Sequence, residues 1–225
     1  MKLCVALDLH SAKENLAIVE KLSGIDLWFK IGLRSFIRDG WKFVDQTRRV
    51  SGAPIFLDLK LHDIPNTTAD AAAEIADRGI EMFNIHASAG TKAMEAAMNR
   101  LHGLSRRPIV LAVTALTSFD NTEFMAIYNS PIEKSAIDMA KLASGAGLDG
   151  VVCSAHESAA IKTAVSDRFL TLCPGVRFNG GGDDQSRVAT PEIAKEQKAD
   201  FIVVGRPILS APDPRAIARS LAHGL

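Results

Sequence analysis

The segment from Asp58 to Thr67, Asp-Leu-Lys-Leu-His-Asp-Ile-Pro-Asn-Thr, places ionisable side chains at spacings suited to proton transfer. Asp58 and Lys60 are two residues apart, so in a strand their side chains point to the same side. Burying both charges costs several kcal/mol per ion unless the ions are paired and hydrogen-bonded. The pair is therefore either a structural ion pair at the mouth of a barrel or part of a catalytic centre.

The residues that follow this pair favour the catalytic interpretation. Asp63 adds a third charge, and Pro65 restricts Ile64 to an extended conformation. Asn66 is expected to cap the helix that comes next. The pattern predicts a rigid loop that holds Asp63 and Thr67 at fixed positions, which a solvated turn would not need.

Short apolar runs rich in β-branched residues alternate with amphipathic helical stretches along the chain. The predicted strands are Leu3–Leu9, Leu27–Gly32, Ile55–Lys60, Met82–Ala87, Ile109–Leu116, Gly150–Ser154, Phe169–Gly175 and Phe201–Gly205. The predicted helices are Ser11–Leu22, Ser35–Val50, Thr67–Arg78, Thr91–Leu104, Ile132–Ala146, His156–Ala164, Pro191–Gln197 and Pro214–Ala222. We expect Ser11 to be the first N-cap, and we expect loop-like insertions near Thr117–Pro131 and Val176–Pro191.

The strand composition indicates a parallel sheet covered on both faces. The predicted strands are nearly continuous apolar runs, as in sheets with helices on either side. Eight strand–helix units in 225 residues predict a single (β/α)8 TIM barrel of the α/β class, one domain over residues 1–225. A doubly wound open sheet is the alternative fold. It would carry Gly-x-Gly-x-x-Gly at the first strand–helix junction, where this chain has Asp8-Leu-His-Ser11.

Polar side chains occur where most of the predicted strands end. In a barrel of this kind the active site lies at the carboxyl ends of the strands, so these residues are site candidates. They are Asp8, Lys30, Asp58, Lys60, His86, Thr117, Arg177 and Arg206. His86 is equally well explained as a hydrogen-bonded barrel residue, so it is not assigned a catalytic role.

Composition excludes several classes of function. The 26 Lys and Arg residues balance the 26 Asp and Glu residues, which argues against nucleic acid or an anionic membrane as the partner and favours a small neutral-to-anionic ligand. Cys4, Cys153 and Cys173 lie far apart in apolar runs, so we expect buried thiols, with neither a disulfide framework nor a metal site. Without a signal-peptide pattern or a membrane-length apolar run, a soluble cytoplasmic protein is expected.

The motif Asp58-x-Lys60-x-x-Asp63-Ile-Pro-Asn-Thr67 resembles the signature of the orotidine 5′-phosphate decarboxylase family. Further segments that resemble this family follow one another in the same order, between residues 5 and 208. They are Val5-Ala-Leu-Asp8, Phe29-Lys30-Ile-Gly32, Asn84-Ile-His-Ala87, Val113-Thr-Ala-Leu-Thr-Ser118, Pro174-Gly-Val-Arg177 and Val204-Gly-Arg-Pro207-Ile.

The resemblance implies decarboxylation of orotidine 5′-phosphate to uridine 5′-phosphate (UMP) and CO2, the last step of de novo pyrimidine nucleotide biosynthesis, without a metal or other cofactor. It implies that Lys60 donates the proton to C6 and that Asp58 lies near the departing carboxylate. Lys30 would complete an array of charges that includes Asp63, and would bond to the ribose. Asp8 would bind ribose hydroxyls.

The resemblance also implies a homodimer, because Asp63, Ile64 and Thr67 in this family reach the neighbouring subunit's site. Gly205 and Arg206 suit a phosphate group on chemical grounds, since backbone N–H groups and a guanidinium would meet there.

The segment between the last two predicted strands offers further substrate contacts. Arg177 and Gln185 bracket a glycine-rich stretch that could close over the phosphate as a lid. Thr117 resembles the family's contact on the pyrimidine side, where it would meet Gln185.

Two other functions stay open from the sequence. Keto-gulonate-phosphate decarboxylases and hexulose-phosphate synthases share Asp-x-Lys-x-x-Asp on a similar barrel and use magnesium, but they lack the Ile-Pro-Asn-Thr continuation. A non-catalytic phosphate-binding barrel is the second alternative, although such a protein would have little reason to keep Asp58, Lys60, Asp63 and Lys30 together.

Overall fold

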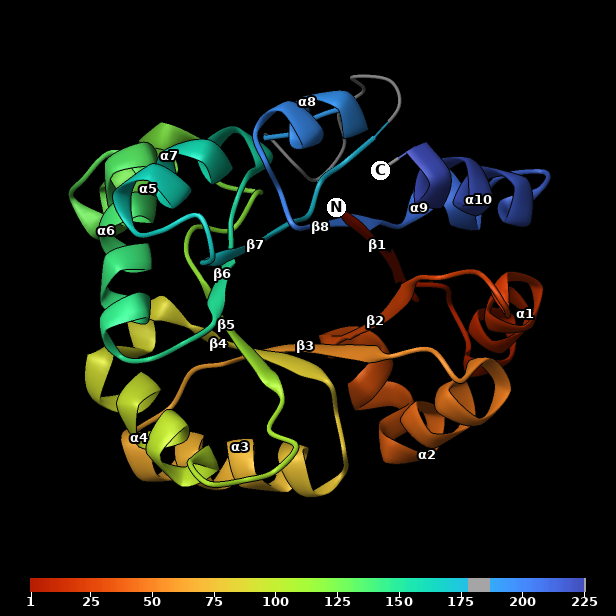
Figure 1. Ribbon diagram of the computed structural model, residues 1–225, viewed down its shortest axis with the longest axis horizontal. Coiled ribbons are helices and arrows are strands. Elements are labelled where there is room, and N and C mark those ends of the chain that lie inside the picture. The colour runs from red at the N-terminus through yellow and green to blue at the C-terminus, as the bar shows by residue number, and fades with distance from the viewer. Residues whose placement is uncertain (178–186, 225) are drawn as a thin grey trace.

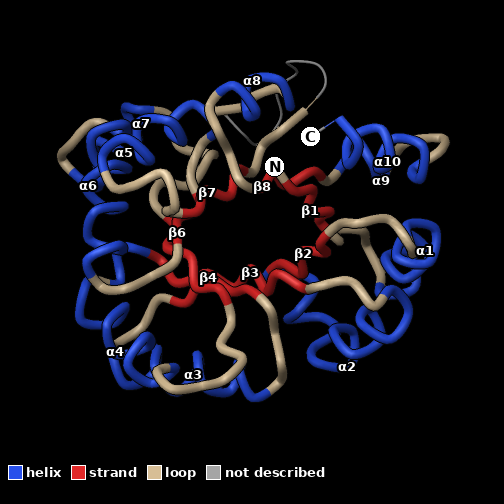
Figure 2. The backbone as a smooth tube through the Cα atoms, in the orientation of Figure 1, coloured by secondary structure: helices blue, strands red, loops and turns tan. Residues whose placement is uncertain are grey.

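The strands form a closed parallel barrel in the computed structural model, which describes residues 1–177 and 187–224 (Figures 1 and 2). The strands are β1 Lys2–Ala6, β2 Trp28–Gly32, β3 Ile55–Leu61, β4 Met82–His86, β5 Ile109–Val113, β6 Gly150–Val152, β7 Leu170–Cys173 and β8 Phe201–Val204. Each strand pairs with the next along the chain, and β8 pairs with β1. The predicted (β/α)8 TIM barrel is confirmed.

The helices lie around the outside of the barrel (Figure 1). They are α1 Ala12–Leu22, α2 Leu33–Ser51, α3 Pro65–Asp77, α4 Thr91–Leu101, α5 Asn121–Tyr128, α6 Ile132–Gly145, α7 Ser158–Ala164, α8 Pro191–Glu196, α9 Arg206–Leu209 and α10 Pro214–Gly224, with short 3-10 helices at Ala87–Ala89 and Ala155–Glu157. No helix in the described part of the chain is long and apolar enough to cross a membrane.

Alternation along the strands divides the apolar side chains into two sets. One set packs inside the barrel: Cys4, Ala6, Trp28, Phe56, Met82, Leu111, Val113, Val152, Leu172, Phe201 and Val203. The neighbouring strand residues, such as Val5 and Val151, pack instead in the larger core shared with the helices. The three cysteines are buried free thiols, as predicted. The buried charged side chains of the strands, Lys30 and Asp58, lie beyond these apolar layers, toward the carboxyl ends.

One of the two predicted helix N-caps is confirmed and the other is wrong. Ser11 is the N-cap of α1, and its hydroxyl accepts a hydrogen bond from the backbone N–H of Glu14 at 3.2 Å. The prediction that Asn66 caps α3 is wrong. This helix begins at Pro65 with Ile64 as N-cap, because proline is well suited to the first helical position.

The predicted Thr117–Pro131 loop contains a helix, α5. Asp120 caps it by accepting a hydrogen bond from the Glu123 N–H at 2.8 Å, and Phe124 is fully buried against Ala115 and Ile132. A capping side chain and one buried aromatic ring are enough to order eight residues whose apolar spacing is irregular. Seven of the eight strands are also shorter than predicted, most clearly β1, which ends at Ala6, and β5, which ends at Val113.

Gly150, the first residue of β6, leaves no room for a side chain against β7. A Cβ atom at this position would lie 2.2 Å from the Leu170 carbonyl oxygen of β7. We expect Gly150→Ala to lower the free energy of unfolding by about 1–3 kcal/mol, because β6 and β7 would have to separate. Gly145 is the control, since a Cβ there meets nothing within 4 Å. Chemical denaturation should show Gly145→Ala neutral or slightly stabilising, and equal destabilisation of both variants would contradict the steric explanation.

Candidate active site

The carboxyl ends of the strands surround a cavity of about 730 Å³. This volume is typical of a small-molecule site. Its described lining carries five cationic side chains and two carboxylates: Lys30, Arg34, Lys60, Arg177, Arg206, Asp8 and Asp58. With neutral histidine, the described lining therefore has three net positive charges and suits an anionic ligand.

Four of these side chains form an ion-paired set, which we call the charged cluster: Asp8, Lys30, Asp58 and Lys60. Lys30 Nζ lies 3.4 Å from Asp8 Oδ2 and 3.5 Å from Asp58 Oδ2. Lys60 Nζ lies 2.7 Å from Asp58 Oδ1. Positive and negative charges alternate through the cluster, and the Asp58 carboxylate lies between the ammonium groups of Lys30 and Lys60. The structure thus brings together residues from three neighbouring strands or strand ends.

Asp58 stays ionised although it is buried. Burial would raise the pKa of its carboxyl, but the charges of Lys30 and Lys60, together with hydrogen bonds from Lys60 and Asn84, leave that pKa below its usual value. The opposite balance holds for Lys30. Burial would lower the pKa of its ammonium, and the carboxylates of Asp58 and Asp8 raise it above its usual value. Both groups are therefore charged at neutral pH.

Lys60 occupies an irregular part of β3. Its φ is 54°, and the register with β4 shifts between Leu57 and Leu61. A left-handed conformation in a residue other than glycine costs about 1–3 kcal/mol. Asp58 and Lys60 lie close together, as predicted. Strand alternation is not the only cause of this contact, because the backbone turns at Lys60.

Asn84 of β4, to which the sequence assigned no role, supports both members of this pair. Its Oδ1 accepts a hydrogen bond from the Lys60 backbone N–H at 2.7 Å, and its Nδ2 donates to Asp58 Oδ1 at 2.8 Å. The side chain is fully buried. An amide suits this position because it donates to the carboxylate and accepts from the backbone at once. The sequence hinted at it in two ways, as a polar residue inside an apolar strand and as the first residue of the family-like segment Asn84-Ile-His-Ala87.

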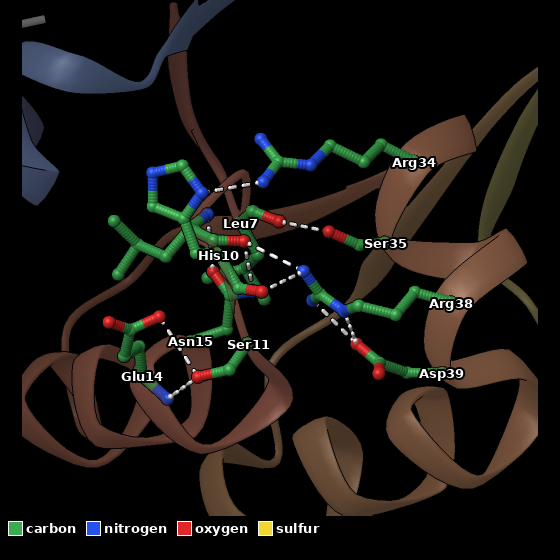
Figure 3. A network of polar contacts seen from close by, with 10 residues as sticks. Leu7, His10, Ser11, Glu14, Asn15, Arg34, Ser35, Arg38 and Asp39 are labelled. Atoms are coloured by element: carbon green, nitrogen blue, oxygen red, sulfur yellow. Dashed lines mark hydrogen bonds and ion pairs between the residues drawn. The ribbon is translucent and has the colours of Figure 1, made fainter.

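Asp8 lies beyond β1, on a loop that α2 holds in place (Figure 3). Ser35 Oγ donates a hydrogen bond to the Leu7 carbonyl at 2.7 Å. Arg38 Nη1 donates to the His10 carbonyl at 2.6 Å. These bonds fix the backbone on both sides of Asp8.

The same loop is bonded to α1 and carries a second polar pair at the cavity rim (Figure 3). Asn15 Oδ1 accepts from the Leu9 N–H at 3.1 Å, and the Arg34 guanidinium donates to His10 Nδ1 at 2.8 Å. Arg34 and His10 both line the cavity. Neither was predicted as a site residue, because each lies in a helix or loop without a recognisable pattern.

Asp63, Ile64 and Thr67 do not line the cavity of their own subunit. All three are exposed, and 67% of the Ile64 surface is accessible. Asp63 Oδ1 accepts a hydrogen bond from the Ile64 N–H at 2.7 Å, while Thr68 Oγ1 donates to the Asp63 carbonyl at 3.0 Å. The segment is locally ordered, yet its side chains are exposed and lie outside the cavity.

The predicted phosphate residues meet at one side of the cavity. Gly205 and Arg206 follow β8, Arg177 follows β7, and all three line the cavity. The Arg177 N–H donates to the Ala189 carbonyl at 2.9 Å. Thr117 lines the cavity beyond β5. Gln185 and the glycine-rich stretch lie outside the described residues.

His86 is a hydrogen-bonded residue at the end of β4, in line with the structural interpretation. Its Nδ1 lies 2.8 Å from Ser88 Oγ, and its ring stacks on exposed His62 with centroids 5.4 Å apart. Burial, and then the nearby His62 and Lys60, lower the pKa of His86 to about 4. Within residues 1–177 and 187–224, no group of three His, Cys, Asp or Glu side chains is placed to hold a metal ion.

Comparisons with known proteins agree with the geometry. The family described as "Orotidine 5'-phosphate decarboxylase / HUMPS family" matches residues 1–221. Orotidine 5′-phosphate decarboxylase of a Nitratiruptor species is 54% identical over 227 residues, covering 100% of both chains. That of a Sulfurovum species is 56% identical over 217 residues, covering 96% of this chain and 94% of the relative.

Solved structures agree as well. The crystal structure of orotidine 5′-phosphate decarboxylase from Lactobacillus acidophilus superposes with a TM-score of 0.84 at 35% identity, covering 98% of this chain and 96% of that one. The match to the family spans nearly the whole barrel, including every strand end that contributes to the cavity. The chain therefore belongs to the orotidine 5′-phosphate decarboxylase / HUMPS family.

Proposed function

We propose that this protein decarboxylates orotidine 5′-phosphate to UMP and CO2, as the last step of pyrimidine nucleotide biosynthesis. The charged cluster is the observation that carries the proposal, because it sets an ammonium next to a fixed carboxylate inside a cationic cavity. Relatives with 54% and 56% identity that bear the name of this enzyme support the choice of substrate.

The charge of the cavity fits this substrate. A phosphate monoester carries up to about two negative charges at neutral pH, and the carboxylate at C6 adds one more. The described lining offers three net positive charges. Gly205, Arg206 and Arg177 would hold the phosphate, while Asp8 and Lys30 would meet the ribose hydroxyls.

Lys60 would supply the proton that completes the reaction. When the bond between C6 and the carboxylate breaks, CO2 leaves and the electron pair stays on C6. The Lys60 ammonium would stabilise that developing charge and then transfer a proton to C6, giving UMP and a neutral amine. The ion pair with Asp58, at 2.7 Å, keeps the ammonium oriented until then.

Asp58 would raise the free energy of the bound substrate, in addition to orienting Lys60. A substrate carboxylate about 4 Å from it would be repelled by about 4 kcal/mol at an effective dielectric constant of about 20. Loss of CO2 removes that repulsion. Since Lys30 and Asn84 hold the Asp58 carboxylate in place, it cannot turn away from the incoming substrate.

We further propose that the protein acts as a homodimer in which Asp63, Ile64 and Thr67 complete the neighbouring subunit's site. The supporting observation is that these residues are ordered but exposed, and do not line their own cavity. Ile64, with 67% of its surface accessible, would be covered in that contact.

The magnesium-dependent reactions known in this family are the alternative function. A direct assay of orotidine 5′-phosphate decarboxylation, with and without a chelator, separates the two. Activity that survives the chelator supports the proposal. A requirement for added magnesium, or turnover of a sugar phosphate alone, would point to the alternative.

Lys60→Ala should lower kcat for orotidine 5′-phosphate by at least about 10³-fold, because the proton donor is lost. Asp58 keeps Lys30 and Asn84 as partners, so circular dichroism and the oligomeric state should not change. Lys92, exposed on α4, is the control, and Lys92→Ala should retain full turnover. Near-normal activity in Lys60→Ala would refute the assigned role.

Arg206→Ala should weaken binding of UMP by about 10- to 100-fold, as expected for one lost hydrogen-bonded charge contact. Affinity for uridine, which lacks the phosphate, should stay the same. Isothermal titration with both ligands checks this. An equal loss for the two would place Arg206 elsewhere than at the phosphate.

Mixing two inactive variants tests the shared site. Dimers of Lys60→Ala with Asp63→Ala would contain one site with both defects and one intact site, so random mixing should restore about a quarter of wild-type activity. Lys60→Ala mixed with Asp58→Ala is the control, because both defects then lie in residues of a subunit's own cavity. Activity measured after co-refolding should stay low in the control. No recovery in the first mixture would argue against exchange of Asp63 between subunits.

A further inference from the structure

Arg187 connects the segment that follows β5 to the rest of the barrel mouth. Its Nη2 donates hydrogen bonds to the carbonyls of Ala115 at 3.0 Å and Leu116 at 3.2 Å. Its backbone N–H donates to the next carbonyl, that of Thr117, at 3.3 Å. Three consecutive carbonyls are thus held by one residue that lies 70 positions further along the chain than Thr117.

Glu157 fixes the guanidinium that makes these bonds. Its carboxylate forms an ion pair with Arg187 Nη1, and only 5% of its side chain is exposed. The second carboxylate oxygen accepts a hydrogen bond from the Ser154 N–H at 3.0 Å, which ties it to the loop after β6. Burial raises the pKa of the Glu157 carboxyl, and the nearby Arg187 opposes that rise. Each of these two side chains therefore needs the other as its charge partner inside the protein.

Arg187 and Glu157 are not among the residues that line the cavity, whereas Ala115, Leu116 and Thr117 are. We propose that Arg187 is a positioning residue, which holds the 115–117 wall, and Thr117 above all, against the base of the bound nucleotide. This inference rests on the proposed function for the identity of that ligand. Gly205 and Arg206, at the phosphate end, follow β8, which is not adjacent to β5 in the barrel. Arg177, the third residue proposed to hold the phosphate, is bonded to the Ala189 carbonyl and not to the three carbonyls that Arg187 holds. Loss of the Arg187 side chain would therefore act on the base end of the cavity.

Two ligands separate positioning from a general structural role. UMP would contact both ends of the cavity, whereas ribose 5-phosphate lacks the base and would contact only the phosphate end.

Removing one member of a buried ion pair leaves the other without a partner, so the informative variant is the double substitution Arg187→Met with Glu157→Gln. Gln can still accept the hydrogen bond from the Ser154 N–H.

We expect the double variant to unfold at a Tm close to that of the wild type. Its dissociation constant for UMP should rise about tenfold, equivalent to about 1.4 kcal/mol. The dissociation constant for ribose 5-phosphate should not change. Isothermal titration of both ligands, with thermal unfolding alongside, makes the comparison. Should the double variant fail to fold, Arg187→Lys keeps the charge but loses the forked donors, and should show the same selective loss.

A matched control lies at the opposite end of the same strand. Arg107, just before β5, forms an ion pair with Asp149 at 2.7 Å and does not line the cavity. Arg107→Met with Asp149→Asn should leave both affinities as in the wild type.

An unchanged UMP affinity, or an equal loss for both ligands, in the Arg187 variants would overturn the positioning role. Wild-type protein that binds neither ligand would overturn the proposed function, and this inference with it.

Discussion

The Asp58 carboxylate between two ammonium groups is the interaction on which the rest of the site depends. A single buried charge of this kind would be too costly to keep, so each partner has to be held at a fixed distance. Lys30 comes from β2, Lys60 from the end of β3 and Asn84 from β4. Three adjacent strands must therefore keep their register for Asp58 to stay ionised, and the closed barrel provides that constraint.

Among the described residues, the buried charged side chains of the barrel interior, Lys30 and Asp58, lie toward the carboxyl ends of the strands. The amino-terminal and central layers of the interior are filled by apolar side chains such as Phe56, Met82 and Phe201, while the charged cluster begins where those layers stop. Close packing of the apolar layers supplies stability that offsets the cost of the charges and of the left-handed Lys60. The same separation gives the cavity an apolar floor and a cationic wall. Electrostatic interactions with a bound ligand are stronger there than in water.

The sequence predicted the fold and six of the seven charged residues in the described cavity lining, because both follow from local patterns. Alternation along β3 placed Asp58 and Lys60 on one side, and apolar runs located all eight strands. The α3 cap was mispredicted because the helix starts at Pro65, two residues before the predicted start at Thr67. The α5 helix was missed because its order depends on the buried ring of Phe124. Asn84 and Arg187 were missed for a different reason. Their partners lie between 24 and 72 residues away, and no local pattern encodes such a contact.

The segment 58–67 divides into two parts that face different directions. Its first part turns inward, with Asp58 buried and Lys60 bonded to it. Its second part turns outward at Asp63, and the bond from Thr68 Oγ1 to the Asp63 carbonyl holds that turn in the free subunit. Covering Ile64 would contribute up to about 1.5–3 kcal/mol to association. In the proposed dimer, only two residues, Leu61 and His62, would thus separate the proton donor of one site from the first residue of the loop that completes the other.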